Sequence, residues 1–174
     1  MSARTGAGCG TDVHASTAVE PSRPYRESMN DTLPAATTAD AQFVHDEWDR
    51  RTRAHDIDGL LDLYLADATL ESPLVPRVLD QSGGLLRGHD ELRRFFVLGT
   101  AGRPNDLVRW YRTGQYMFNG HTLIWEYPRQ APEWEQVDLV EVMELAGPRI
   151  ARHRIYWGWY GTPLLQHTPG ANVS

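Results

Sequence analysis

Cysteine is almost absent from this sequence: Cys9 is the single cysteine among 174 residues. A disulfide framework within the chain, or a metal site built from several cysteines, is therefore excluded. No stretch approaches the roughly 18 consecutive apolar residues that a membrane-spanning helix needs. Residues 1–30 also lack the apolar central stretch of a secretory signal peptide. We therefore expect a cytoplasmic protein that does not contact membranes.

The chain has no run of Lys or Arg, and its formal net charge is −6. Such a charge balance repels phosphate backbones, so nucleic acid is not expected as a partner. Tryptophan, by contrast, is abundant, with Trp110, Trp125, Trp157 and Trp159 in predicted strands. Such residues most often form core, but so many indoles also suit a planar, apolar ligand.

The first residues of the chain show no hydrophobic periodicity. Residues 1–38 are rich in Ser, Thr, Ala, Gly and Pro, which predicts a disordered tail. One domain is expected over 39–162, followed by a C-terminal tail over 163–174. Within the domain, apolar residues at helical spacing predict three helices, at 39–55, 57–65 and 88–98. A brief strand is expected at 68–71, and a loop at 74–87.

The first predicted helix has Phe43, Val44 and Trp48 on its apolar stripe and Asp40 as its cap. Tyr64 falls at helical spacing in the second. The remainder of the chain alternates apolar and polar residues, which predicts strands at about 107–118, 121–128, 136–145 and 150–160. Asn119-Gly120 between two such runs indicates a hairpin. Helices followed by an antiparallel meander define an α+β fold.

Alternation along the last two strands separates an apolar face from a polar one. In 136–145 the apolar face carries Val137, Leu139, Glu141, Met143 and Leu145. In 150–160 it carries Ala151, His153, Ile155, Trp157 and Trp159. Each apolar face contains one titratable group. The sheet is therefore predicted to present Glu141 and His153 to its interior.

Two interpretations of this pair remain open. A buried carboxyl needs a partner, since leaving it unpaired costs roughly a few kcal/mol or raises its pKa, so Glu141 and His153 could simply satisfy each other or a tyrosine. Alternatively, they form an acid–base pair, since histidine titrates near neutral pH. The register decides whether they meet: a three-residue turn keeps both on one face, whereas a two-residue turn puts them on opposite faces.

Several runs resemble the signature of ketosteroid isomerase and SnoaL-like proteins of the nuclear transport factor 2-like superfamily. They include Ala66-Asp67-Ala68-Thr69-Leu70-Glu71-Ser72-Pro73, Arg87-Gly88-His89-Asp90-Glu91-Leu92 and Val137-Asp138-Leu139-Val140-Glu141-Val142-Met143. The resemblance covers roughly 40–160. It implies a cone in which three N-terminal helices pack on a strongly curved, mostly antiparallel sheet around one pocket. It also implies a homodimer through the outer sheet face, where Arg152, Arg154 and Tyr156 would lie.

The resemblance also assigns roles to residues of this chain. The proton-abstracting Asp of steroid isomerases falls on Ser72, which cannot be that base unaided. The tyrosine that donates to the oxyanion falls on Trp48, which keeps an indole N–H donor. The protonated Asp of the oxyanion hole falls on Glu141, a retained carboxylic acid. Steroid isomerisation by the usual mechanism is therefore not expected.

Other pocket positions are kept or changed in the same way. The supporting tyrosines correspond to Tyr64, which is retained, and to Phe96, which is not. The pocket tryptophan of the last strand is retained as Trp157, and an apolar pocket neighbour becomes His153. The resemblance also directs Glu126 into the pocket, although the alternation of its strand argues the other way.

Two functions of different classes follow. The first is a cofactor-free enzyme of isomerase, cyclase or lyase/hydratase type, in which Glu141 and His153 act on a hydrophobic carbonyl compound. Trp48, Tyr64, Ser72, Phe96, Trp110, Glu126 and Trp157 would contact the substrate. The second is a binding or accessory protein that holds a small hydrophobic ligand without reacting. No metal is expected, because the spacing of His121, His153 and Glu141 is not diagnostic.

Overall fold

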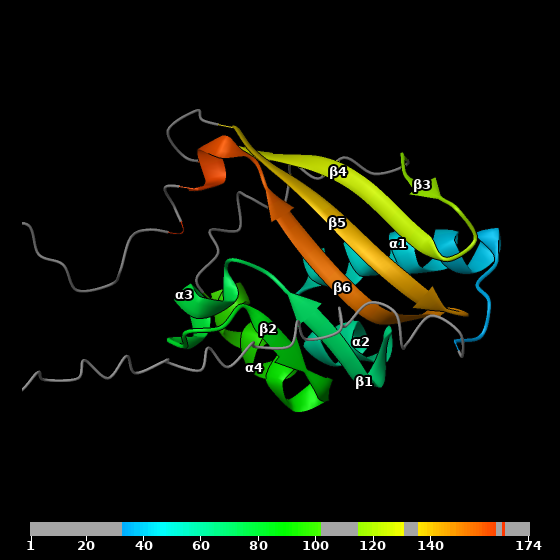
Figure 1. The fold of residues 1–174 in the computed structure, drawn as a ribbon, viewed down its shortest axis with the longest axis horizontal. Coiled ribbons are helices and arrows are strands. Elements are labelled where there is room, and N and C mark those ends of the chain that lie inside the picture. The colour runs from blue at the N-terminus through cyan, green and yellow to red at the C-terminus, as the bar shows by residue number, and fades with distance from the viewer. Residues whose placement is uncertain (1–32, 102–114, 131–135, 163–164, 166–174) are drawn as a thin grey trace, which may run out of the picture. The chain divides into compact units, whose positions relative to one another are not determined.

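The computed structural model describes residues 33–101, 115–130, 136–162 and 165. Helices occupy the first part of this region, and long strands occupy the second (Figure 1). The predicted α+β class is confirmed. The predicted domain limits stay a prediction, and the pocket stays a prediction as well. No helix among the described residues is long and apolar enough to cross a bilayer.

Helix α1 (Thr38–Ala54) begins with a capping box. The Thr37 side chain accepts a hydrogen bond from the Asp40 backbone N–H, and the Asp40 carboxylate accepts one from the Thr37 backbone N–H. Asp40 is therefore the third helical residue of the box and not the cap itself. Phe43 is 46% exposed, which corrects its predicted place on the buried stripe. That stripe consists of Ala41, Val44, His45, Trp48 and Thr52.

The second helix is shorter than predicted. Helix α2 covers Ile57–Asp62, and strand β1 covers Tyr64–Glu71. Tyr64 therefore belongs to a strand, although its spacing from Leu60 and Leu61 fits a helix. The reason is tertiary: the Leu63 carbonyl accepts a hydrogen bond from Ile150, and Tyr64 pairs with Ile150 on strand β6 (Arg149–Trp157). Pairing within the sheet overrides the local periodicity.

The predicted loop over 74–87 contains regular structure. Helix α3 covers Val75–Leu79, and strand β2 covers Leu85–Arg87. Val75 of α3 is 0% exposed and Leu86 of β2 is 1% exposed, so each of these two elements buries one apolar side chain. Helix α4 (Gly88–Ala101) follows directly and buries Leu92, Phe95 and Phe96. It is longer than the predicted helix over 88–98.

Six strands of the described residues form one curved, unclosed sheet, in the order β2-β1-β6-β5-β4-β3 (Figure 1). Strands β4 and β5 cover Thr122–Gln130 and Gln136–Ala146. The β1–β6 pair is parallel and the other pairs are antiparallel. The sheet is therefore mostly antiparallel, as predicted. The hairpin at Asn119-Gly120 is confirmed, because β3 (Met117–Phe118) pairs with β4.

Two predicted strands are shorter in the described part of the chain than the sequence pattern indicates. Of the strand expected over 107–118, residues 107–114 lie outside the described part of the chain, and only Met117–Phe118 is strand in the rest. The last strand ends at Trp157. Trp159 begins a short 3₁₀ helix, η2 (Trp159–Gly161), and is 81% exposed. It therefore does not extend the apolar inner face, which corrects the prediction.

The turn between β5 and β6 decides whether the predicted pair can meet. It has two residues, Gly147-Pro148, and Gly147 adopts φ 57°, a conformation that favours glycine. With unbroken pairing on both sides, such a turn would put His153 and Glu141 on opposite faces of the sheet.

A bulge next to this turn reverses that outcome. The pairing shifts by one residue, and Ala151 is the additional residue on β6. The pairs on either side of the shift are Leu145–Ile150 and Glu144–Arg152, and they are followed by Met143–His153 and Glu141–Ile155. His153 and Glu141 therefore share the inner face of the sheet. The single residue Ala151 brings the acid and the imidazole together.

Candidate functional site

Four side chains from four elements form a continuous hydrogen-bonded network inside the domain. The Trp48 Nε1–H of α1 donates to the Tyr64 hydroxyl of β1 at 3.3 Å. That hydroxyl is 2.9 Å from Nδ1 of His153 on β6. Nε2 of His153 is 2.5 Å from Oε2 of Glu141 on β5. We call these four residues the buried network.

Water has almost no access to the buried network. Exposed fractions are 5% for Trp48, 1% for Tyr64, 0% for His153 and 1% for Glu141. The surroundings are aromatic: the Trp125 ring lies 5.5 Å from that of Trp48, and Trp48 meets His153 edge-on at 6.0 Å. A charge here is much less screened than one at the surface.

One arrangement of protons satisfies the donors and acceptors of the network. Indole N–H can only donate, so the Tyr64 oxygen accepts from Trp48 and its O–H is available for Nδ1 of His153. Nε2 of His153 then carries the other proton and donates it to the Glu141 carboxylate. In this arrangement every one of these contacts has one donor and one acceptor.

Burial raises the pKa of Tyr64 far above its ordinary value. The hydrogen bond from Trp48 acts in the opposite direction, and the negative charge of Glu141 adds to the upward shift. Burial thus outweighs the indole hydrogen bond. Tyr64 therefore stays protonated over the physiological range and remains a donor to His153.

The structure brings together only some of the predicted substrate-contacting residues. Phe96 packs against Tyr64 with ring centroids 5.7 Å apart. Trp157 lies on the inner row of β6, and its buried Nε1 has no hydrogen-bond partner among the described residues. Ser72 is buried, but its hydroxyl accepts a hydrogen bond from the Leu74 backbone N–H and belongs to the turn after β1.

Two other candidates do not join the buried network. Glu126 is exposed, whereas its neighbour Trp125 is 4% exposed and paired with Glu141. Glu126 therefore follows the alternation of its strand and faces outward, which corrects the placement implied by the resemblance. Trp110 lies outside the described residues.

His121 is also separated from the network. Its Nε2 lies 3.9 Å from Glu144 on the outer side of β5, where Glu144 forms ion pairs with Arg154 at 2.8 Å and Arg152 at 3.4 Å. The combination of His121 with His153 and Glu141 therefore does not form. Over the described ranges, no group of three or more His, Cys, Asp or Glu side chains is arranged to hold a metal ion.

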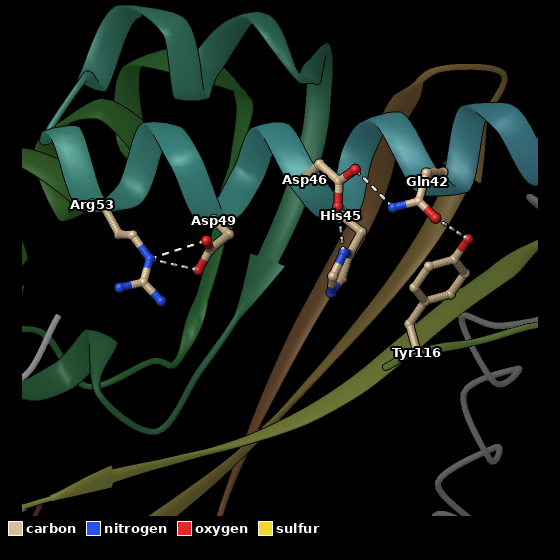
Figure 2. Close-up of polar contacts among 6 residues, drawn as sticks. All are labelled: Gln42, His45, Asp46, Asp49, Arg53 and Tyr116. Carbon is tan, nitrogen blue, oxygen red and sulfur yellow. Dashed lines mark hydrogen bonds and ion pairs between the residues drawn. The ribbon is translucent and has the colours of Figure 1, made fainter. Parts of the chain in front are cut away.

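Sequence reasoning missed one buried titratable residue, His45, which is 2% exposed. Its Nδ1 lies 3.0 Å from Oδ1 of Asp46 (Figure 2). Its spacing of four residues from Ala41 and three from Trp48 puts it on the buried stripe of α1. That spacing is the signal that identifies His45, whereas a stripe predicted through Phe43 leaves it out.

Replacing Tyr64 by phenylalanine tests the central link of the network. The variant keeps the ring but leaves the Trp48 N–H and His153 Nδ1 without this hydroxyl. We expect the free energy of unfolding to fall by about 1–3 kcal/mol in denaturant titrations. Tyr156→Phe is the matched control, because Tyr156 is 51% exposed, and it should change stability little. Equal effects of the two substitutions would contradict the network.

The raised pKa of Tyr64 also predicts how stability depends on alkaline pH. The folded state retains the Tyr64 proton, whereas the unfolded chain releases it near the ordinary tyrosine pKa of about 10. The stabilisation is therefore complete below pH of about 10 and is lost as the pH rises further. Since Tyr64→Phe lacks this contribution, its stability should approach that of the wild type above pH of about 10. A constant difference from neutral to alkaline pH would contradict the shift.

Comparison with solved structures identifies the fold. A SnoaL-like protein of unknown function from Burkholderia thailandensis matches 70% of this chain and 98% of its own, with a TM-score of 0.56 and 18% identity. An NTF2-like protein of unknown function from Burkholderia pseudomallei matches 72% of this chain and 96% of its own, with a TM-score of 0.57 and 16% identity. No protein-family model and no curated protein sequence matches the chain.

A candidate ketosteroid isomerase from Kribbella flavida is a third structural neighbour, with a TM-score of 0.52 and 12% identity over 69% of this chain and 78% of its own. These likenesses confirm the fold of the nuclear transport factor 2-like superfamily. Within that superfamily, the neighbours are SnoaL-like and ketosteroid isomerase-like proteins. Because one fold hosts many activities, the function must be argued from the site.

Proposed function

We propose that the protein is a cofactor-free acid–base enzyme, of isomerase, cyclase or lyase/hydratase type, that acts on a hydrophobic carbonyl compound. The observation that carries this proposal is the contact between Glu141 and His153 inside an otherwise apolar, aromatic interior. Burying two titratable groups is costly, and proton transfer in a water-poor site is a function that repays the cost.

The Glu141–His153 pair acts as one proton acceptor. Both nitrogens of His153 are already hydrogen-bonded, one to Tyr64 and one to Glu141. The pair takes a proton from the carbon next to the carbonyl group. The C–H electrons form the C=C bond of an enolate, and the carbonyl π electrons move to the oxygen. In an isomerisation the proton returns to another carbon of a conjugated enolate. In a cyclisation the enolate carbon bonds to a second carbonyl carbon of the substrate, the π electrons of that carbonyl move to its oxygen, and the oxygen takes the proton from the pair.

The enolate oxygen needs a donor, and Trp48 can supply one. Its Nε1–H lies 3.3 Å from the Tyr64 oxygen, which is a long hydrogen bond that a ligand oxygen could replace. Trp48 also occupies the position of the oxyanion tyrosine in the resemblance to ketosteroid isomerases. A donor directed at developing negative charge is worth about 3–4 kcal/mol in other enzymes.

A second candidate function is non-catalytic binding of a small hydrophobic ligand. The observation that favours it is the near-complete enclosure of the pair, because His153 is 0% and Glu141 1% exposed. Catalysis requires a ligand to displace part of this cover. In a binding protein, the ligand needs only to occupy space beside that cover.

Hydrogen–deuterium exchange separates the two functions. The bicyclic ketone α-tetralone carries exchangeable hydrogens beside its carbonyl group, and mass spectrometry in D₂O detects their replacement. An enzyme accelerates this exchange above the rate in buffer, whereas a binder stabilises the protein thermally without accelerating exchange. Absence of both effects across a panel of apolar ketones would contradict both functions.

We further propose a homodimer formed through the outer face of the sheet, where Tyr156 is 51% exposed. Light scattering should give the mass of two chains. Tyr156→Glu should shift the distribution toward one chain, because a carboxylate at the interface loses its hydration when the dimer forms. The matched substitution Tyr156→Phe should leave the dimer intact. A wild-type mass of one chain would contradict the proposal.

A further inference from the structure

His45 is a buried imidazole that the proposed mechanism does not use. Its side chain extends from the side of α1 that faces the sheet (Figure 2). Its ring contacts two aromatic side chains. The ring of Trp125 meets it edge-on at 5.3 Å, and that of Tyr116 lies 5.0 Å away. Trp125 also contacts Trp48. His45 therefore lies on the same inner side of the sheet as the buried network, beyond the Trp48–Trp125 pair.

A chain of hydrogen bonds fixes the orientation of this imidazole (Figure 2). The Tyr116 hydroxyl donates to Oε1 of Gln42 at 2.9 Å, and Nε2 of Gln42 donates to Oδ2 of Asp46 at 2.7 Å. Oδ1 of Asp46 is then left to accept from Nδ1 of His45 at 3.0 Å. The hydrogen bond from Gln42, followed by that from His45, lowers the pKa of Asp46, so its carboxylate is ionised.

These contacts assign the tautomer of His45. Because Nδ1 carries the proton that is donated to Asp46, Nε2 of the neutral ring carries a lone pair. Within the described part of the chain, Nε2 has no hydrogen-bond partner. An imidazole lone pair held in an aromatic interior is a site for a group that donates a hydrogen bond.

We propose that His45 is a ligand-contacting residue that selects for a hydroxyl group: its Nε2 accepts a hydrogen bond from a phenolic or enolic O–H of the bound carbonyl compound. This inference rests on the proposed function, because it concerns the same ligand. It extends that function by naming a second polar group, on the far side of the aromatic pair from the Glu141–His153 contact. Asp46 acts through His45 and is a positioning residue.

Matched ligands test the selection directly. The probes are α-tetralone and its phenolic derivatives, each with one hydroxyl on the aromatic ring, and their affinities are measured by calorimetry. For wild-type protein, at least one phenol should bind about tenfold more tightly than α-tetralone. His45→Phe should remove this preference while α-tetralone binds as before. His121→Phe, which changes a histidine on the outer side, should retain it.

The tautomer provides a second measurement that needs no ligand and no substitution at His45. In ¹⁵N NMR spectra of the wild type, neutral His45 should carry its proton on Nδ1. Asp46→Ala should shift the population toward the Nε2–H form, and the preference for phenols should weaken with it. A residue that served only packing would not change ligand preference in this way.

The outcomes are separable from those of the proposed function. Binding of α-tetralone without any preference for a phenol overturns this inference alone. An Nε2–H tautomer in the wild type does the same, even if the His45 variant fails to fold. Failure of every ketone to bind overturns this inference together with the proposed function. Accelerated exchange of α-tetralone with loss of phenol selection in His45→Phe supports both.

Discussion

Replacing His153 by leucine should lower the free energy of unfolding by about 3–5 kcal/mol. The imidazole is 0% exposed and bonds to both Tyr64 and Glu141. Without it, Glu141 loses the hydrogen bond from His153 but stays in the interior. Denaturant titrations of the two proteins measure this loss.

The double variant Glu141→Leu with His153→Leu is the informative comparison. It removes the second polar group as well, so no carboxylate is left facing an apolar side chain. We expect it to be more stable than His153→Leu alone, because apolar residues often replace a buried pair at little cost. Such a result would indicate that the pair is retained for chemistry. A double variant destabilised by the sum of the single losses would indicate a structural role.

Replacing Glu141 by glutamine should slow ketone deuterium exchange by about 10²–10⁴-fold. The amide keeps the size of the side chain but cannot accept the proton as the carboxylate does. Binding of the ketone should change little, since shape and apolar contacts are kept. His153→Phe should likewise abolish exchange while the ketone still binds. Rates are measured by mass spectrometry, and affinities by calorimetry on the same samples.

Glu126→Gln is the matched control for this experiment. Glu126 is a carboxylate on the strand next to Glu141, but it is exposed on the other face. Its substitution should leave the exchange rate unchanged. If Glu126→Gln slowed exchange as much as Glu141→Gln, the assignment of the inner pair would be wrong. Undiminished exchange in Glu141→Gln would lead to the same conclusion.

Strand alternation was sufficient to predict that Glu141 and His153 face inward, because it depends only on backbone geometry. Whether they meet could not be predicted. The two-residue turn alone would separate them, and the bulge at Ala151 restores their common face. A bulge depends on how two strands align over their whole length, so no local pattern in the sequence reveals it.

The residues that complete the site were harder to predict for related reasons. Tyr64 fits the spacing of α2, and only its pairing with Ile150 makes it part of β1. His45 shares a helical stripe with Trp48, but the neighbouring Phe43 offers a more hydrophobic alternative. In both cases a tertiary contact chooses between two local patterns of similar strength.

A crystal structure with a bound ketone tests the central claim most directly. If the buried pair transfers the proton, the carbon beside the carbonyl group lies about 3–3.5 Å from Glu141 or His153, with Trp48 or Trp125 moved aside to admit it. A ketone bound elsewhere, with both tryptophans still covering the pair, would contradict the account.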